Sequence, residues 1–95
     1  MLIVDLLKRA RHIQEISGGR IGMCGCIKVV CDMHFLYYDS IYCIERNIPA
    51  FNAWNFTGKR QPPYHFWWPL SDKESRLKAF DTLIMLYENS DKEWH

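Results

Sequence analysis

The sequence has almost no net charge and no long apolar run, and these two absences narrow its possible functions. Its 95 residues include 12 Lys and Arg against 11 Asp and Glu, which gives a formal net charge of +1. Nonspecific duplex binding requires an overall basic field, so any anion site must come from local clustering of cations. No segment approaches the ~18 apolar residues of a membrane-spanning helix. We therefore expect neither nucleic acid nor a membrane as a partner.

A secretory signal is also absent from the start of the sequence. The apolar residues from Met1 to Leu7 are interrupted by Asp5, and the basic residues Lys8 and Arg9 follow them. This order is the inverse of a signal peptide. We therefore expect the four cysteines to be free thiols in a reducing cytoplasm, and we do not read them as a disulfide framework.

The spacing of a structural zinc site is missing as well. Cys24, Cys26, Cys31 and His34 are residue types that bind zinc, and positions 31 and 34 share a helical face. The paired C-x2-C knuckles of such sites are absent, however, and Cys24 and Cys26 point to different sides of a helix. We expect no metal, although these residues keep a zinc-stabilised nucleic-acid-binding module open as a third alternative.

Motifs of nucleotide-dependent enzymes are also lacking. The glycine series from Gly18 to Gly25 follows a predicted helix, whereas a dinucleotide fingerprint follows a strand. The segment from Thr57 to Arg60 lacks the upstream glycine and the final Ser or Thr of a P-loop. No two carboxylates make a convincing acid–base pair. We therefore expect no catalytic residue and no cofactor, and an enzyme ranks behind every binding function.

What the sequence does contain is apolar residues at helical spacing. It is 48% hydrophobic and 15% aromatic, which is enough to fold as one small helical domain over residues 1–95. Apolar residues recur every three or four positions from 2 to 13 and from 77 to 87, which predicts an amphipathic helix in each segment. Ser71 and Glu74 form a Ser-x-x-Glu capping box for the last helix.

The middle of the chain predicts further helices and then a loop. A stripe from 23 to about 38 favours a helix, although Val29 and Val30 also suit a strand. Asp39-Ser40 predicts the cap of a short helix that ends before Pro49. The proline punctuation from Pro49 to Pro69 predicts a loop. The predicted fold is therefore all-α, with three to four helices and one long aromatic loop.

Two segments near the helix ends complete the prediction. Ser17-Gly18-Gly19 predicts the end of the first helix, and the glycines there are typical of a turn that permits close helix contact. The charged residues from Glu88 to Glu93 predict a frayed tail, in which Trp94 is the anomaly.

The predicted loop carries the candidate binding residues. Cations beside flat rings can hold phosphate while the rings stack on a base. Trp67 and Trp68 are adjacent, so they cannot both point into one pocket of an extended segment, and we expect one of them in the core. The phosphate-binding candidates are Arg20, Lys59, Arg60 and Arg76, and the stacking candidates are Tyr64, His65 and either Trp67 or Trp68.

Three segments together resemble a family of short accessory proteins of tailed bacteriophages. They are Gly22-Met23-Cys24 at a helix start, Tyr-x-Phe-Trp-Trp-Pro-Leu from Tyr64 to Leu70, and Arg-x3-Phe-x2-Leu from Arg76 to Leu83. The resemblance covers about half the chain, and its motifs are structural. It implies expression in the host cytoplasm and a role in host takeover or defence evasion, which such proteins usually perform by binding.

From these observations we expect a non-enzymatic phage anti-defence protein that sequesters a nucleotide-derived immune signal. Cations, aromatic faces and helix-end amides are sufficient for such a function. The main alternative is a protein-blocking inhibitor of a host defence effector or nuclease, which would use the same aromatic residues as hot spots. We also expect a homo-oligomer, because three short helices cannot easily cover so much apolar surface.

Overall fold

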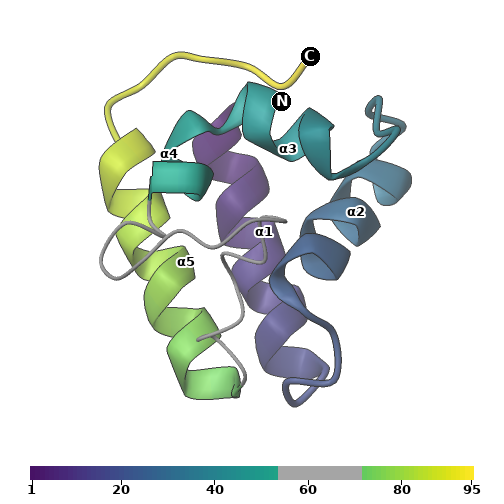
Figure 1. Cartoon of the computed structure of the whole chain (residues 1–95), viewed down its shortest axis with the longest axis vertical. Helices are drawn as coiled ribbons and strands as arrows, with labels where there is room; N and C mark the ends of the chain where they lie inside the picture. Colours follow the sequence, from purple (N-terminus) through teal and green to yellow (C-terminus); the bar gives the residue numbers. More distant parts are fainter. Residues whose placement is uncertain (54–71) are drawn as a thin grey trace.

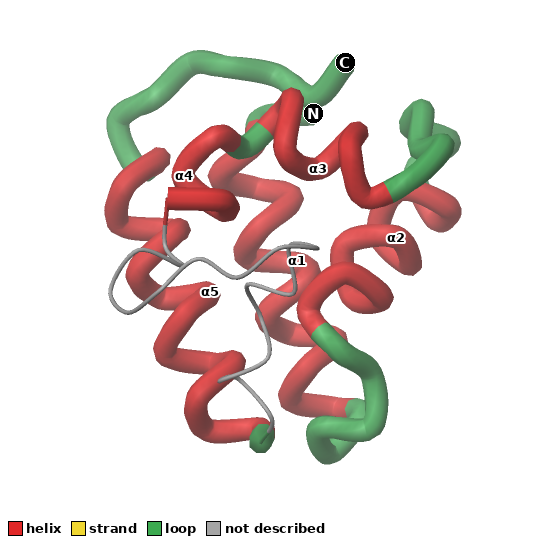
Figure 2. The backbone as a smooth tube through the Cα atoms, in the orientation of Figure 1, coloured by secondary structure: helices red, strands yellow, loops and turns green. Residues whose placement is uncertain are grey.

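The structure is a computed structural model that describes residues 1–53 and 72–95, and this part of the chain is all-α (Figures 1 and 2). The prediction of a small all-α fold is therefore confirmed. The helices are α1 (Ile3–Ile16), α2 (Met23–Met33), α3 (Ile41–Asn47), α4 (Pro49–Ala53) and α5 (Lys73–Tyr87).

Helix α1 is the centre of the fold, with α2 on one side and α5 on the other (Figure 1). Its predicted apolar stripe is buried, and Phe80 and Leu83 of α5 and Val30 of α2 pack into the same core. Helices α3 and α4 lie across one end and add Ile44 and Phe51 to that core. The stripe predictions for 2–13 and 77–87 are therefore confirmed. The buried residues of α1 are Ile3, Val4, Leu6, Leu7, Ala10 and Gln14.

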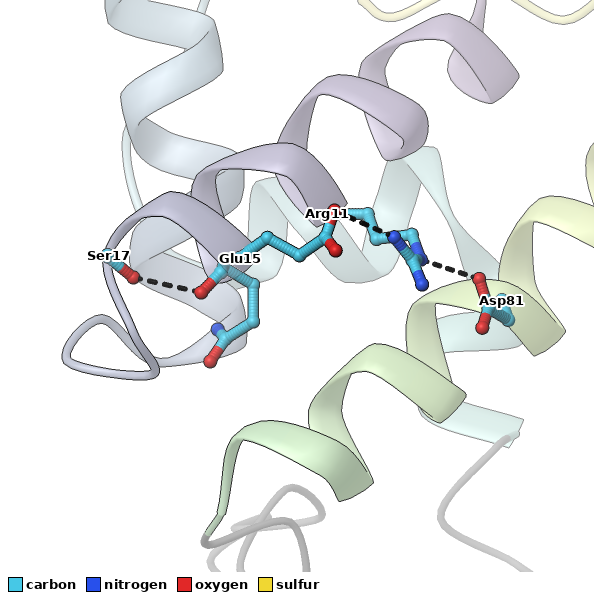
Figure 3. Close-up of polar contacts among 5 residues, drawn as sticks. Arg11, Glu15, Ser17 and Asp81 are labelled. Atoms are coloured by element: carbon cyan, nitrogen blue, oxygen red, sulfur yellow. Dashed lines mark hydrogen bonds and ion pairs between the residues drawn. The ribbon is translucent and has the colours of Figure 1, made fainter.

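A polar contact also joins α1 to α5 on the molecular surface (Figure 3). Arg11 Nε donates to Asp81 Oδ1 at 2.6 Å, and Arg11 Nη1 donates to Glu15 Oε1 at 3.0 Å. Because exposed ion pairs contribute only about 0–1 kcal/mol each, the apolar core holds the two helices together.

Helix α1 ends where the sequence predicted, before Ser17-Gly18-Gly19. Gly18 N–H donates to Glu15 O and Gly19 N–H donates to Gln14 O, which is the Schellman arrangement. Gly18 and Gly19 have φ of 66° and 83°, where a side chain would be strained. Arg76 of α5 donates to Gly19 O at 2.7 Å and to Gln14 Oε1 at 3.4 Å, so α5 holds this turn in place.

Of three helix boundaries predicted in the middle of the chain, one agrees with the structure and two do not. Ser40 caps α3 as predicted, since its Oγ accepts from Tyr42 N–H. Helix α2 ends at Met33, so the prediction of a helix to about Tyr38 was wrong. Pro49 was read as the start of a loop, but it begins α4, because the first helical position needs no N–H and suits the fixed φ of proline.

The cap of α5 also differs from the prediction. Asp72 is the N-cap residue, and its Oδ1 accepts from Ser75 N–H at 2.7 Å. The capping box of Ser71 with Glu74 was therefore wrong by one position, because two adjacent residues both have good capping side chains and the helix begins after the second. Ser71 itself and the loop from 54 to 71 lie outside the described residues.

The prediction of a frayed tail was wrong. Ile3 N–H donates to Lys92 O, and Trp94 N–H donates to Met1 O, so the tail pairs with the start of α1. The tail crosses the end of the fold and brings the two ends of the chain together (Figure 1). Trp94 is 6% exposed, and burial of its large ring accounts for the docking of this charged segment. Within the described ranges, no helix is long and apolar enough to cross a membrane.

Candidate protein-binding surface

Large apolar side chains are exposed at the end of α2, on the connection that follows it and at the start of α3. Seven such side chains are exposed in the described residues, and four of them fall between positions 33 and 42. Single exposed apolar side chains scattered over a surface are normal, whereas four within ten consecutive positions make this part of the chain a candidate interaction site. We call these four residues the α2–α3 surface: Met33, Phe35, Tyr37 and Tyr42.

Phe35 is the most unusual of the four. Its side chain is 96% exposed, and its backbone has φ of 56°, the only positive φ at a non-glycine residue in the described chain. Leu36 N–H donates to Cys31 O at 2.8 Å, which is the long hydrogen bond of a Schellman helix end. Phe35 therefore occupies the position that Gly18 occupies at the end of α1. The chain closes one helix with the usual glycine and the other with an exposed aromatic residue.

Neither the helix end nor the core explains this phenylalanine. The left-handed conformation costs an L-residue roughly 1–2 kcal/mol, which glycine avoids. A ring that is 96% exposed gains almost nothing from burial within the chain. Strained residues of this kind cluster at sites of function. Phe35 is therefore a candidate contact residue for a partner.

The segment after Phe35 is fixed to the rest of the fold. Trp94 Nε1 donates to Tyr37 O at 2.6 Å, and Cys43 Sγ lies 3.5 Å from the same oxygen. Tyr37 OH donates to Asp39 Oδ2 at 2.9 Å. These contacts hold the backbone of an exposed connection, so binding there would require little ordering of the chain.

The hydrogen bond between Tyr37 and Asp39 also shifts the pKa of both side chains. The bond from Tyr37 OH lowers the pKa of Asp39, whereas Asp39 raises the pKa of the Tyr37 phenol. At neutral pH the pair therefore keeps an ionised carboxylate and a neutral phenol. Tyr37 can then still accept a hydrogen bond through its oxygen.

The cysteines have the properties of buried thiols. All four are free; Cys26, Cys31 and Cys43 are buried, and Cys24 is half-buried. Burial raises the pKa of Cys24 and of Cys31 to about 12. Because the thiolate is the nucleophile, these thiols are poorly suited to cysteine chemistry. In residues 1–53 and 72–95, no three His, Cys, Asp or Glu side chains are arranged to hold a metal ion.

Two of the predicted ligand-binding residues lie in the described part of the chain. Arg76 contacts the backbone of Gly19, next to the exposed Arg20, so the structure brings these two arginines to the same turn. Arg76 already donates to Gly19 and Gln14, which gives it a role in holding the turn. The other six candidates lie outside the described residues, and their role stays a prediction: Lys59, Arg60, Tyr64, His65, Trp67 and Trp68.

Sequence reasoning missed the α2–α3 surface for an identifiable reason. The predicted second helix, which extended to about Tyr38, placed either His34 or Phe35, and also Tyr38, on its apolar face. The helix ends earlier, so Phe35 projects outward and Tyr38 is half-buried. The sequence offers no glycine or asparagine there to signal a left-handed residue.

Comparison of the chain with protein-family models, with curated proteins and with solved structures gives no significant match.

Proposed function

We propose that this protein is a non-enzymatic binding protein that blocks a protein partner through the α2–α3 surface. The observation that carries the proposal is Phe35, an aromatic residue held almost fully exposed in a strained backbone conformation. Aromatic residues dominate binding energy at protein interfaces. The partner accordingly presents an apolar recess that receives this ring.

The resemblance to bacteriophage accessory proteins supports a bacterial partner. A blocking protein needs no catalytic group, and Cys24 and Cys31, whose pKa is raised by burial, are poorly suited to act as nucleophiles. Its effect depends on covering a partner's working surface, which a rigid connection carrying aromatic side chains does at a small entropic cost. Sequestration of a nucleotide-derived signal relies mainly on residues outside the described ranges, so it stands second.

A capture experiment tests this proposal. The tagged protein is incubated with bacterial lysate, and retained proteins are quantified by mass spectrometry for the native sequence, Phe35→Ala and Leu86→Ala. Leu86 is the matched control, because it is 61% exposed on α5 and away from the α2–α3 connection. We expect a specific protein to be retained by the native sequence and by Leu86→Ala, and to be lost with Phe35→Ala.

Two results would contradict the proposal. If the same proteins are retained by all three chains, or if none is retained above background, Phe35 is not a contact for a bacterial protein. Isothermal titration with cyclic dinucleotides provides the second test. If cyclic dinucleotides bind tightly to both the native sequence and Phe35→Ala, and no protein is captured, the sequestering function is favoured.

A further inference from the structure

A pocket between α1 and α2 has a cationic rim and an apolar floor. Its volume is about 250 Å³. Lys8, Arg9 and His12 approach it from α1, and His34 approaches it from the end of α2. The floor is formed by three apolar side chains, Ile13, Val30 and Met33.

The charges of this rim are not neutralised within the described residues. None of the four ion pairs found there involves Lys8 or Arg9, and no carboxylate lines the pocket. Arg11, two positions further along α1, shows the contrast, because it contacts both Glu15 and Asp81. The cations at the pocket thus remain available to an external anion.

The apolar floor of the pocket indicates that the ligand also has an apolar part. Val30 is 1% exposed and Ile13 is half-buried, so the base of the pocket belongs to the core, whereas Met33 is 62% exposed at the edge. Methionine is flexible and polarisable and adapts to flat rings. A volume of about 250 Å³ lies below the ~300–1,000 Å³ typical of sites for drug-sized ligands. The pocket volume therefore fits a ligand whose apolar part consists of one or two rings.

We propose that the α1–α2 pocket binds a small amphipathic anion, in which a carboxylate, sulfonate or phosphate is carried on an apolar body of one or two rings. The anionic group is held by Lys8 and Arg9, with N–H donors from His12 and His34. The apolar body lies on Ile13, Val30 and Met33. Charge-assisted hydrogen bonds are roughly twice as strong as neutral ones, so the exposed cations Lys8 and Arg9 favour an anion over a neutral group of the same shape. This pocket shares Met33 with the α2–α3 surface, but Phe35, which carries the proposed protein contact, does not line it.

The test is a titration followed by amide chemical shifts in ¹⁵N-labelled protein. The probes share one two-ring body: 1-naphthoate, 1-naphthalenesulfonate, 1-naphthyl phosphate and the neutral 1-naphthalenemethanol. Adenosine monophosphate is a further arm. We expect the anions to shift amides of residues 8–13 and 30–34 and the neutral alcohol to bind at least tenfold more weakly. The ranking of carboxylate against phosphate then distinguishes the source of the natural ligand.

Three variants tie the binding to the pocket. The double variant Lys8→Gln with Arg9→Gln should weaken anion binding by at least ~10-fold, the ratio expected for one charge-assisted hydrogen bond. Lys73→Gln with Lys78→Gln removes the same charge from exposed positions of α5 and should change the affinity less than twofold. Met33→Glu places a carboxylate at the exposed edge of the floor and should also weaken anion binding.

Several outcomes would overturn the proposal. These are equal binding of the neutral alcohol, shifts located outside the two segments, an equal loss in the α5 control, or no binding of any anion at millimolar concentration. Phe35→Ala should leave anion binding unchanged. The titration therefore tests the pocket, and the capture experiment independently tests the contact at Phe35.

Discussion

Replacement of Phe35 tests whether its ring serves the fold or a partner, and two substitutions separate these roles. Phe35→Ala removes the ring but keeps a side chain at φ of 56°. Because the ring is 96% exposed, we expect the free energy of unfolding to change by less than ~0.5 kcal/mol, as for surface substitutions generally. Phe35→Gly removes the ring and also relieves the strained backbone.

The expected gain from glycine follows from two opposing effects. Relief of the left-handed conformation contributes roughly 1–2 kcal/mol, and the greater freedom of glycine in the unfolded chain opposes it by roughly 0.5–1 kcal/mol. Phe35→Gly should therefore be more stable than Phe35→Ala by about 0.5–1 kcal/mol. For a domain of this size that difference raises the melting temperature by roughly 2–8 °C.

Gly18 provides the reverse control, in which a side chain is added to a glycine at the equivalent position. It occupies the same position at the end of α1, with φ of 66° and open space where a Cβ would stand. Gly18→Ala should therefore lose about what Phe35→Gly gains. Urea unfolding followed by circular dichroism measures all three variants. If Phe35→Ala is destabilised by more than ~1 kcal/mol, the ring serves the fold. If Phe35→Gly is no more stable than Phe35→Ala, the backbone at position 35 is not strained. Either result contradicts our reasoning.

Three further predictions concern the tail, the cap of α5 and the assembly. Trp94→Ala should cost about 3–5 kcal/mol of stability by loss of a buried ring, and Trp94→Phe about 1–3 kcal/mol by leaving Tyr37 O without its indole donor. The exposed neighbour Glu93→Ala should cost less than ~1 kcal/mol, and equal losses in urea unfolding would indicate an undocked tail. Asp72→Ala should lower the melting temperature more than Ser71→Ala, and the Asp72 contribution should depend on pH. Its bond from Ser75 N–H lowers the pKa of Asp72 in the folded state, so the contribution is full above the unfolded pKa of ~3.9 and is lost as pH falls through the folded value; a difference between native and Asp72→Ala that persists at pH 2 would contradict the cap. Light scattering should give the mass of a dimer or larger closed oligomer, and the mass of one chain across micromolar concentrations would exclude this.

The sequence was sufficient for the apolar stripes of α1 and α5 and the start of α3, but not for α4, for the end of α2 or for contacts between distant segments. The stripes of α1 and α5 and the cap at Ser40 depend on neighbours within four positions, so their periodicity was readable. Trp94 docks through Met1 O and Tyr37 O, which are 93 and 57 positions away in the sequence, and no local pattern encodes such a contact.

The candidate site was less predictable for the same reason. Lys8 and Arg9 were readable only as residues on the polar face of a helix, because the pocket exists only where α2 packs beside them. Either His34 or Phe35 was placed in an apolar stripe, because helical spacing alone does not reveal where a helix ends. The aromatic loop had the most unusual composition in the sequence. The candidate binding residues that it carries lie outside the described residues, so its role stays a prediction.

The central claim is that Phe35 contacts a protein partner, and site-specific photocrosslinking tests it most directly. The photoreactive residue benzoylphenylalanine is placed at position 35 or, as the control, at position 86, which is also exposed, and bacteria producing each protein are irradiated. We predict a discrete crosslinked product between the chain and one bacterial protein from position 35 and none from position 86. Absence of a product from position 35, or the same products from both positions, would contradict the account.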